Sequence, residues 1–278
     1  MSAFLGWQDR IKNATFSGGS WTSGLPLANL RNWPRSRVAR SSSLAGTLFD
    51  FDLGAAYPLR AGMLAGHNLS PSAQWRLTLG SAPGGSDLFN SGWQPAWFLP
   101  FDNSWLEWES TSWWDGSIDP DLSGSPYHLP MILPDWIAAR YGRLELSDPG
   151  NPAGYVQAGR FVLCSGIKVL QNRGEEEGWR DLSIEQTMAS GVRYTESRDA
   201  LRQVKLQLDW IDRHAEAGEF YELQRSLRTV GDVLYLPDLS DYQACQRSGF
   251  IGRLTELSAI THPLVNYSRA PIQIEEMK

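Results

Sequence analysis

Apolar and polar residues alternate in short runs along this chain, and such alternation predicts β-strands. In the clearest run, the side chains of Phe49, Phe51 and Leu53 would share one face of a strand. Asp50 and Asp52 would share the other face, because successive side chains of a strand point to opposite sides. One face of this strand should therefore be buried and the other should face water.

A second run about ninety residues later has the same character. Leu144 and Leu146 alternate with charged residues until the segment Asp-Pro-Gly-Asn-Pro at 148–152, which encodes a turn. The strand after the turn changes phase, so we expect a bulge at Gly159. Its inward-pointing residues would be Val156, Ala158, Phe161 and Leu163.

Other segments extend the β pattern and add one helix. Residues 59–64 form an apolar run typical of a strand covered on both faces, and residues 75–79 alternate. In the second half, a strand over 204–210 should have one buried and one wet face. A helix over 213–228 follows, with Asp212 as its N-cap and Gly231 beyond its end. Later strands are expected over 233–237 and around Ile272 and Ile274.

The amino-acid composition changes over residues 84–136, and we interpret this segment as an insertion between two sandwich strands. This segment holds seven of the thirteen tryptophans and eight carboxylates, and no Lys or Arg occurs between Arg76 and Arg140. So many large aromatic residues make disorder improbable. Three interpretations stay open: packing on its own sandwich, contact with a subunit or partner, and capture of carbohydrate.

Together with Gly66-His67-Asn68-Leu69, the two alternating segments resemble the discoidin-like (galactose-binding-like) jelly roll of bacteriophage tail proteins, over about residues 20–165. The later strand, helix and strand resemble the β-sandwich-plus-helix domains of distal-tail and baseplate proteins. We therefore expect a mostly β chain with two domains. Residues 1–168 would form a jelly-roll β-sandwich with the Trp-rich insertion 84–136, and residues 169–278 a smaller β-sandwich carrying one α-helix.

Composition narrows the function classes. A formal net charge of −6 argues against general binding of DNA. No apolar run is long enough for a membrane span and the N-terminus lacks the pattern of a signal peptide, so we expect a soluble protein made in a cytoplasm. Cys164 and Cys245 lie in different halves and should be two buried thiols.

No catalytic constellation occurs in the sequence, so we expect neither an enzyme nor a cofactor. The four histidines are scattered, and His67 should have a structural role beside a turn. The paired Glu107 and Glu109 could flank a sugar, although acidic residues two apart are usually just solvated. Asp115, Asp119 and Asp121 begin like a calcium loop, but prolines occupy the positions of its Gly and bidentate Glu.

The strongest interface candidates are aromatic and basic. An acidic, apolar insertion suits a basic surface better than it suits a second insertion. Arg35, Arg37 and Arg40 of a neighbouring copy of the chain could form that basic surface. The alternative for these arginines is a solvated strand edge. The tryptophans expected at the interface are Trp93, Trp97, Trp105, Trp108, Trp113 and Trp114.

The resemblance implies a structural component of a phage tail tip or baseplate, located in the virion and assembled in the host cytoplasm. Its partners would be copies of itself in a hexameric or trimeric ring and other tail proteins, without nucleic acid or membrane insertion. The alternative is a receptor-binding module that captures host-surface glycans through the jelly-roll loops or the Trp-rich insertion.

Overall fold

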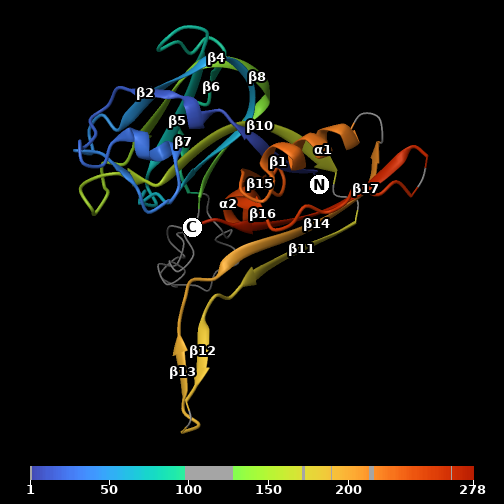
Figure 1. Cartoon of the computed structure of the whole chain (residues 1–278). Coiled ribbons are helices and arrows are strands. Elements are labelled where there is room, and N and C mark those ends of the chain that lie inside the picture. The colour runs from blue at the N-terminus through green and yellow to red at the C-terminus, as the bar shows by residue number, and fades with distance from the viewer. Residues whose placement is uncertain (1, 98–127, 171–172, 189, 213–215, 264) are drawn as a thin grey trace, which may run out of the picture. The chain divides into compact units, whose positions relative to one another are not determined.

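The computed structural model describes residues 2–97, 128–170, 173–188, 190–212, 216–263 and 265–278 (Figure 1). Its fold is mostly β, which confirms the fold class expected from the sequence. The chain divides into two compact units. The sandwich unit comprises Gln8–Gly166 and Leu236–Gly249, and the sheet–helix unit comprises Met1–Trp7, Ile167–Tyr235 and Phe250–Lys278.

One sheet dominates the sandwich unit. Its hydrogen-bonded order is β10-β4-β8-β5-β6, with β2 paired to β4 and β7 paired to β5, while β3 and β9 form a separate pair. The strands are β2 (Thr15–Ser17), β3 (Ala39–Arg40), β4 (Leu48–Ala65), β5 (Gln74–Gly80), β6 (Phe89–Asn90), β7 (Gln94–Pro95), β8 (Leu129–Ser147), β9 (Gln157–Ala158) and β10 (Arg160–Leu170). The helical segments are η1 (Ile11–Asn13), η2 (Leu27–Arg31) and α2 (Tyr242–Ser248).

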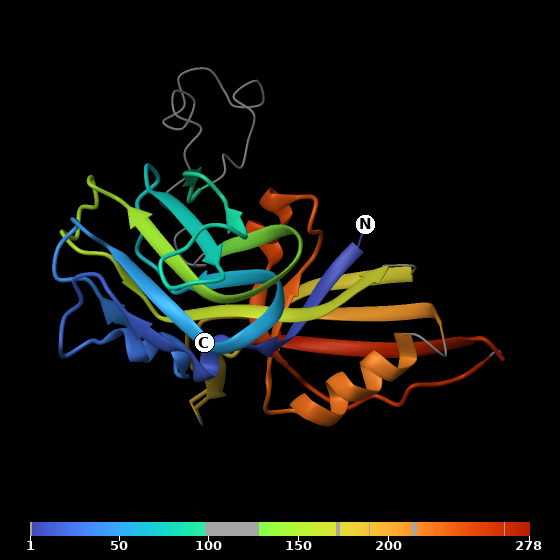
Figure 2. The same ribbon diagram turned by 90° about the horizontal axis from the view of Figure 1, so that it is seen from above.

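The two alternating segments of the sequence pair with each other. Phe49 of β4 lies opposite Leu144 of β8, and Asp50 lies opposite Arg143, in an antiparallel register. The alternating apolar residues of the two segments are buried in one core, as expected: Phe49, Phe51, Leu53, Leu144 and Leu146. Figure 2 shows β4 and β8 curving together through the unit, and their register shifts between Asp52 and Tyr57.

The ends of the expected insertion belong to the sandwich. Residues 129–136 are the first part of β8, and the short strands β6 and β7 pair with β5. The insertion therefore does not extend over the whole of 84–136, and its central residues 98–127 lie outside the described part of the chain. The phase change at Gly159 is confirmed, since this glycine separates β9 from β10 and donates its N–H to the Ala65 carbonyl at 3.0 Å.

The sheet–helix unit contains a sheet of order β11-β14-β17-β16-β15-β1-β10, and one two-stranded hairpin. The strands β1 and β10 contribute residues to both units. Its elements are β1 (Ser2–Asp9), β11 (Arg173–Arg180), β12 (Ile184–Thr187), β13 (Arg193–Glu196), β14 (Leu201–Asp212), α1 (Glu216–Leu227), β15 (Asp232–Leu236), β16 (Phe250–Leu254) and β17 (Tyr267–Glu276).

Among the described side chains of β14, alternation agrees with the sequence over 204–208 and fails at Asp209, while the side chain of Trp210 lies outside the described ones. Val204, Leu206 and Leu208 are buried against the apolar stripe of α1, and Lys205 is exposed. Asp209, expected on the wet face, is instead buried because the Arg269 guanidinium of β17 lies 2.5 Å from its carboxylate. The strands β1, β11, β12, β13 and β16 and the helix α2 had not been expected from the sequence.

Both cysteines are buried free thiols, as expected. Burial raises the pKa of the Cys245 thiol to about 12 and raises that of Cys164 as well. Neither thiol is therefore poised for nucleophilic chemistry near neutral pH.

Candidate functional site

A groove of about 410 Å³ lies in the sandwich unit, where residues distant in the sequence meet. One wall comes from β4 and β8, a second from β5 with the β6–β7 loop, and a third from the segment that leads into α2. Its volume falls in the range of roughly 300 to 1,000 Å³ that is usual for small-molecule sites. The lining residues are Arg60, Trp75, Phe89, Asn90, Ser91, Gln94, Ile132, Leu133, Pro134, Leu239 and Tyr242.

The β6–β7 loop is held in place by its own hydrogen bonds. Ser91 Oγ accepts from the Leu77 N–H at 2.9 Å and donates to the Gly92 carbonyl at 2.7 Å. Asn90 Oδ1 accepts from the Gly92 N–H, and Gln94 Nε2 donates to the Ser91 carbonyl, each at 2.9 Å. Within the described residues, these bonds leave the Asn90 amide NH₂ and the Gln94 carbonyl oxygen for a ligand.

Arg60 supplies the charge of the groove. Its side chain starts from β4 and is half-buried, and its Nη1 is buried with no hydrogen-bond partner within the described residues. Burial lowers the pKa of this guanidinium, and the nearby Asp135 carboxylate opposes the shift. A buried donor without a partner is costly to the fold, so it calls for a physical explanation.

Helix α2 fixes the third wall. The Asp241 carboxylate caps the helix by accepting from the Ala244 N–H at 2.9 Å, and Gln246 Nε2 donates to the Ala96 carbonyl at 2.8 Å. Tyr242 Oη donates to the Pro130 carbonyl at 2.6 Å. Burial raises the pKa of Tyr242, so this residue presents a neutral phenol edge to the groove.

The predicted tryptophans fall into three groups. Trp93 is 45% exposed, and the Arg76 guanidinium lies 4.9 Å from its ring centroid. Trp97 packs on its own sandwich, where its ring meets His67 edge-on and its Nε1 donates to the Leu69 carbonyl at 3.2 Å. The remaining candidates lie outside the described residues, namely Trp105, Trp108, Trp113 and Trp114, the pair Glu107 and Glu109, and the calcium candidates Asp115, Asp119 and Asp121.

Two of the three predicted basic residues contact their own chain. Arg35 Nη1 lies 3.3 Å from His128 Nε2. Arg40 donates to Gln157 Oε1 at 3.1 Å, and its guanidinium lies 4.1 Å from the centroid of the Tyr155 ring. Arg37 is exposed. The basic edge proposed for a neighbouring copy is therefore largely engaged within the sandwich unit, and its role in assembly stays a prediction.

His67 has the structural position expected beside a turn. Its Nδ1 accepts from the Leu69 N–H at 3.4 Å, and the adjacent Asn68 bridges to the chain around residue 155 by donating to the Tyr155 carbonyl. Burial, with a smaller contribution from His128, lowers the pKa of His67 to about 3. This imidazole is therefore neutral over the ordinary range of pH.

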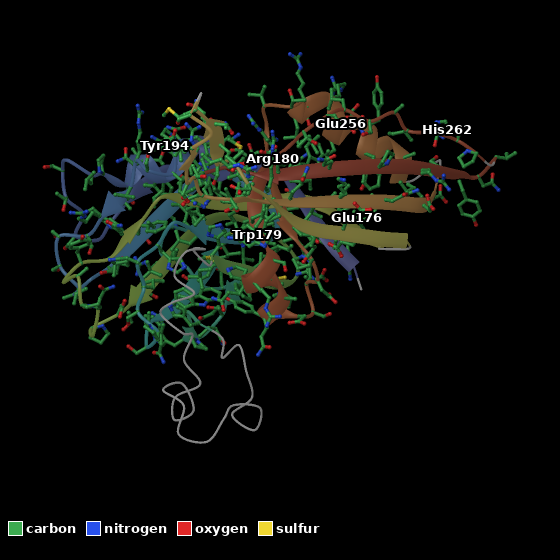
Figure 3. The ribbon with its side chains drawn as sticks, turned by 90° about the horizontal axis from the view of Figure 1, so that it is seen from below. Glu176, Trp179, Arg180, Tyr194, Glu256 and His262 are labelled. Atoms are coloured by element: carbon green, nitrogen blue, oxygen red, sulfur yellow. The ribbon has the colours of Figure 1, made fainter. Side chains whose placement is uncertain are left out.

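A smaller groove of about 210 Å³ lies in the sheet–helix unit, between β11, β14 and β17. Figure 3 labels two of its carboxylates, Glu176 and Glu256. The Glu176 carboxylate lies 3.4 Å from Lys205 Nζ, so the principal cation of this groove is already paired. The cation of this groove therefore already has a partner, whereas Arg60 Nη1 in the groove of the sandwich unit has none among the described residues.

In the part of the chain that the structure describes, no cluster of three or more His, Cys, Asp or Glu is arranged to hold a metal ion. No helix among the described residues is long and apolar enough to cross a membrane.

No protein-family model matches this chain, and no curated protein matches it. Among solved structures, the family 32 carbohydrate-binding module of Clostridium perfringens NanJ in complex with galactose matches with 8% identity and a TM-score of 0.39, covering 58% of this chain and 99% of that one. The lectin-binding domain of lectinolysin complexed with Lewis b matches with 13% identity and a TM-score of 0.37, covering 58% and 97%.

A family 89 glycoside hydrolase of Clostridium perfringens matches with 12% identity and a TM-score of 0.38, covering 57% of this chain and only 15% of the hydrolase. Nothing in these comparisons indicates a phage tail or baseplate protein. At such identities and TM-scores the matches carry no argument about function, which must be argued from the groove itself.

Proposed function

We propose that the sandwich unit binds a carbohydrate in the groove beside Arg60. The observation that carries the proposal is a groove of about 410 Å³ that is lined by the half-buried Arg60 together with the Asn90 and Gln94 amides. Arg60 is the only charged side chain among the described residues that line this groove, so a ligand oxygen has a cationic donor to bind there. This assigns binding to the chain and no catalytic step.

The chemistry of the lining favours a sugar over a purely apolar ligand. A sugar presents closely spaced hydroxyl groups that both donate and accept hydrogen bonds. The guanidinium of Arg60 offers several donors in a fixed fork, and the Asn90 and Gln94 amides add a donor and an acceptor. Apolar and aromatic edges, including Phe89 and Leu239, can pack against the C–H face of the ring.

Arg60 and Gln94 provide the test of this proposal. Replacing either side chain, as Arg60→Met or Gln94→Ala, should weaken glycan binding by about tenfold or more, since each removes a hydrogen bond to the ligand worth about 1 to 3 kcal/mol. Gln94→Ala also removes the bond from Gln94 Nε2 to the Ser91 carbonyl, so Arg60→Met is the cleaner of the two tests. The assay is a glycan array with the purified chain, followed by calorimetric titration of the best glycan. Arg193→Met, which changes an exposed arginine of the sheet–helix unit, is the matched control and should bind like the unaltered chain.

The variants should keep the circular dichroism spectrum and melting temperature of the unaltered chain. If no glycan on the array binds, or if Arg60→Met and Gln94→Ala both bind as tightly as the control, the groove is not a carbohydrate site.

A second candidate function is assembly into a larger protein particle, as the resemblance to phage tail proteins implies. The observation that favours it is the exposed apolar face of the hairpin β12–β13. The tail or baseplate itself, the ring order, the neighbouring tail proteins and the virion location stay predictions of that resemblance.

A further inference from the structure

The hairpin β12–β13, here called the arm, leaves the sheet of its unit. Below the arm, β11 pairs with β14 as far as Arg180 opposite Leu201, and β17 supports β14 only from Gln203 onward. The arm continues this ladder as two strands with no third strand beside them in the described residues. Figure 1 shows it projecting beyond β11 and β14.

The arm separates apolar from polar residues. Residues directly opposite in an antiparallel pair share a face, so the register assigns every side chain to one side. Near the tip, the Met188 N–H donates to the Val192 carbonyl at 2.8 Å, which places these two residues opposite each other. One face carries Ile184, Gln186, Met188, Val192, Tyr194 and Glu196, and the other carries Glu185, Thr187, Arg193 and Thr195.

The apolar face of the arm lies open to solvent. Its four large apolar side chains are 37%, 55%, 63% and 57% exposed, in the order Ile184, Met188, Val192 and Tyr194. Figure 3, which views the molecule from below, labels Tyr194 on the arm. A two-stranded hairpin is only marginally stable in water unless its apolar face is covered. The arm therefore has the composition of a surface that is buried against a partner.

The charges of the arm favour another copy of the chain as that partner. On the polar face, Arg193 pairs with Glu185 at 3.4 Å, and at the root Arg198 lies 2.9 Å from the Glu196 carboxylate. These pairs neutralise the arm internally, so two arms have little electrostatic reason to repel each other and no excess charge to attract an oppositely charged partner.

The strand edges of the arm also favour another copy of the chain as the partner. Exposed strand edges in monomeric proteins are usually protected by charged side chains, above all Lys, or by Pro; the segment from Ile184 to Glu196 contains neither Lys nor Pro, and its Arg193 is paired with Glu185. A strand pair with so little protection tends to associate with another strand pair of the same kind.

We infer that two copies of this chain associate through the apolar faces of their arms, in an isologous contact about a two-fold axis. With the root of one arm over the tip of the other, the two Glu196 carboxylates lie at opposite ends of the contact. Four partly exposed side chains per arm bury less than the roughly 1,200 Å² of a standard stable interface, so the dimer is of the small, transient class.

Sedimentation velocity over a concentration series tests the inference. The unaltered chain should pass from monomer to dimer across the micromolar range. Val192→Lys, which places a charge on the apolar face, should weaken the dimer at least tenfold. Thr195→Lys introduces the same charge on the opposite face of the arm and should leave the association unchanged. Glycan binding should be unaffected by either variant, which separates this result from the carbohydrate proposal.

Three outcomes overturn the inference. The unaltered chain could remain a monomer at several hundred micromolar. The two lysine variants could weaken association equally, which would make it an effect of charge alone. A discrete oligomer that withstands Val192→Lys would place the contact elsewhere on the chain.

Discussion

At the level of single residues, the alternating pattern predicted which face of a strand each side chain lies on. It did not predict which residue each side chain pairs with. The sequence placed Asp50 and Asp52 on the face opposite the core, and there they pair with Arg143 at 2.6 Å and Arg140 at 2.8 Å. Hydrogen bonding to Arg140 lowers the pKa of Asp52. No local pattern joins residues about ninety positions apart, so these pairs became visible only in the folded register.

A buried ion pair was missed for the same reason. Arg160 is fully buried, donates to Asp9 Oδ2 at 2.6 Å and reaches the Leu30 carbonyl at 3.1 Å. In the sequence it follows Gly159 in an otherwise apolar strand, where an arginine would be expected to point outward. Arg160 contacts Asp9 and Leu30, which lie in two distant segments of the sequence that no periodic pattern connects to it.

His67 should make the stability of the chain depend on pH. Its pKa is about 3 in the folded protein against 6.5 as its ordinary value, so between these values the unfolded chain binds more protons. Stability should therefore fall as the pH drops below about 6.5. Because carboxylates titrate lower, urea unfolding between about pH 5 and pH 7 isolates the histidine effect.

The variant His67→Phe keeps an aromatic ring beside Trp97 and should lose this slope between pH 5 and pH 7. His262→Gln, which replaces an exposed histidine of the sheet–helix unit, should keep it. An unchanged slope in His67→Phe would contradict the assignment of the depressed pKa to this residue.

At the level of elements, long alternating runs were predicted well and short or composite features were not. The strands β4, β5, β8 and β14 and the helix α1 follow clear periodicities in the sequence. Helix α2 has only seven residues, and its sequence shows no stripe of apolar residues at helical spacing. The groove was missed altogether, because Arg60 lies in an apolar run and lines the same groove as Tyr242 only through the folding together of distant segments.

Strand β8 approaches the core so closely at Gly142 that only glycine fits. A Cβ there would lie 2.3 Å from Cζ of the buried Phe51 ring and 2.9 Å from Leu79 Cδ2. Gly142→Ala should lower the free energy of unfolding by about 1 to 3 kcal/mol, because the ring must move in a packed core. Chemical denaturation measures the loss. Gly178→Ala in β11 is the control, since a Cβ there meets nothing within 4 Å.

For Gly178→Ala we expect a change near zero. Equal effects of the two substitutions would show that close packing over Phe51 does not limit residue 142.

At the level of the whole molecule, the chain builds two cores from interleaved segments. One core gathers Phe49, Leu144 and Phe161, and the other gathers Leu5, Leu206 and Ile274. The sequence suggested two domains in succession, with a boundary near residue 168. It could not reveal that residues 1–7 belong to the sheet–helix unit and residues 236–249 to the sandwich unit, because each of these segments is too short to carry a pattern of its own.

Separate cores predict separate melting. Differential scanning calorimetry should show two transitions, each reporting on one unit. Leu144→Ala and Ile274→Ala each empty a fully buried site in one core, which should cost about 2 to 5 kcal/mol through lost burial and the cavity left behind. Leu144→Ala should lower only the transition of the sandwich unit, and Ile274→Ala only that of the sheet–helix unit. A single transition that both substitutions shift together would mean that the two cores unfold as one cooperative body.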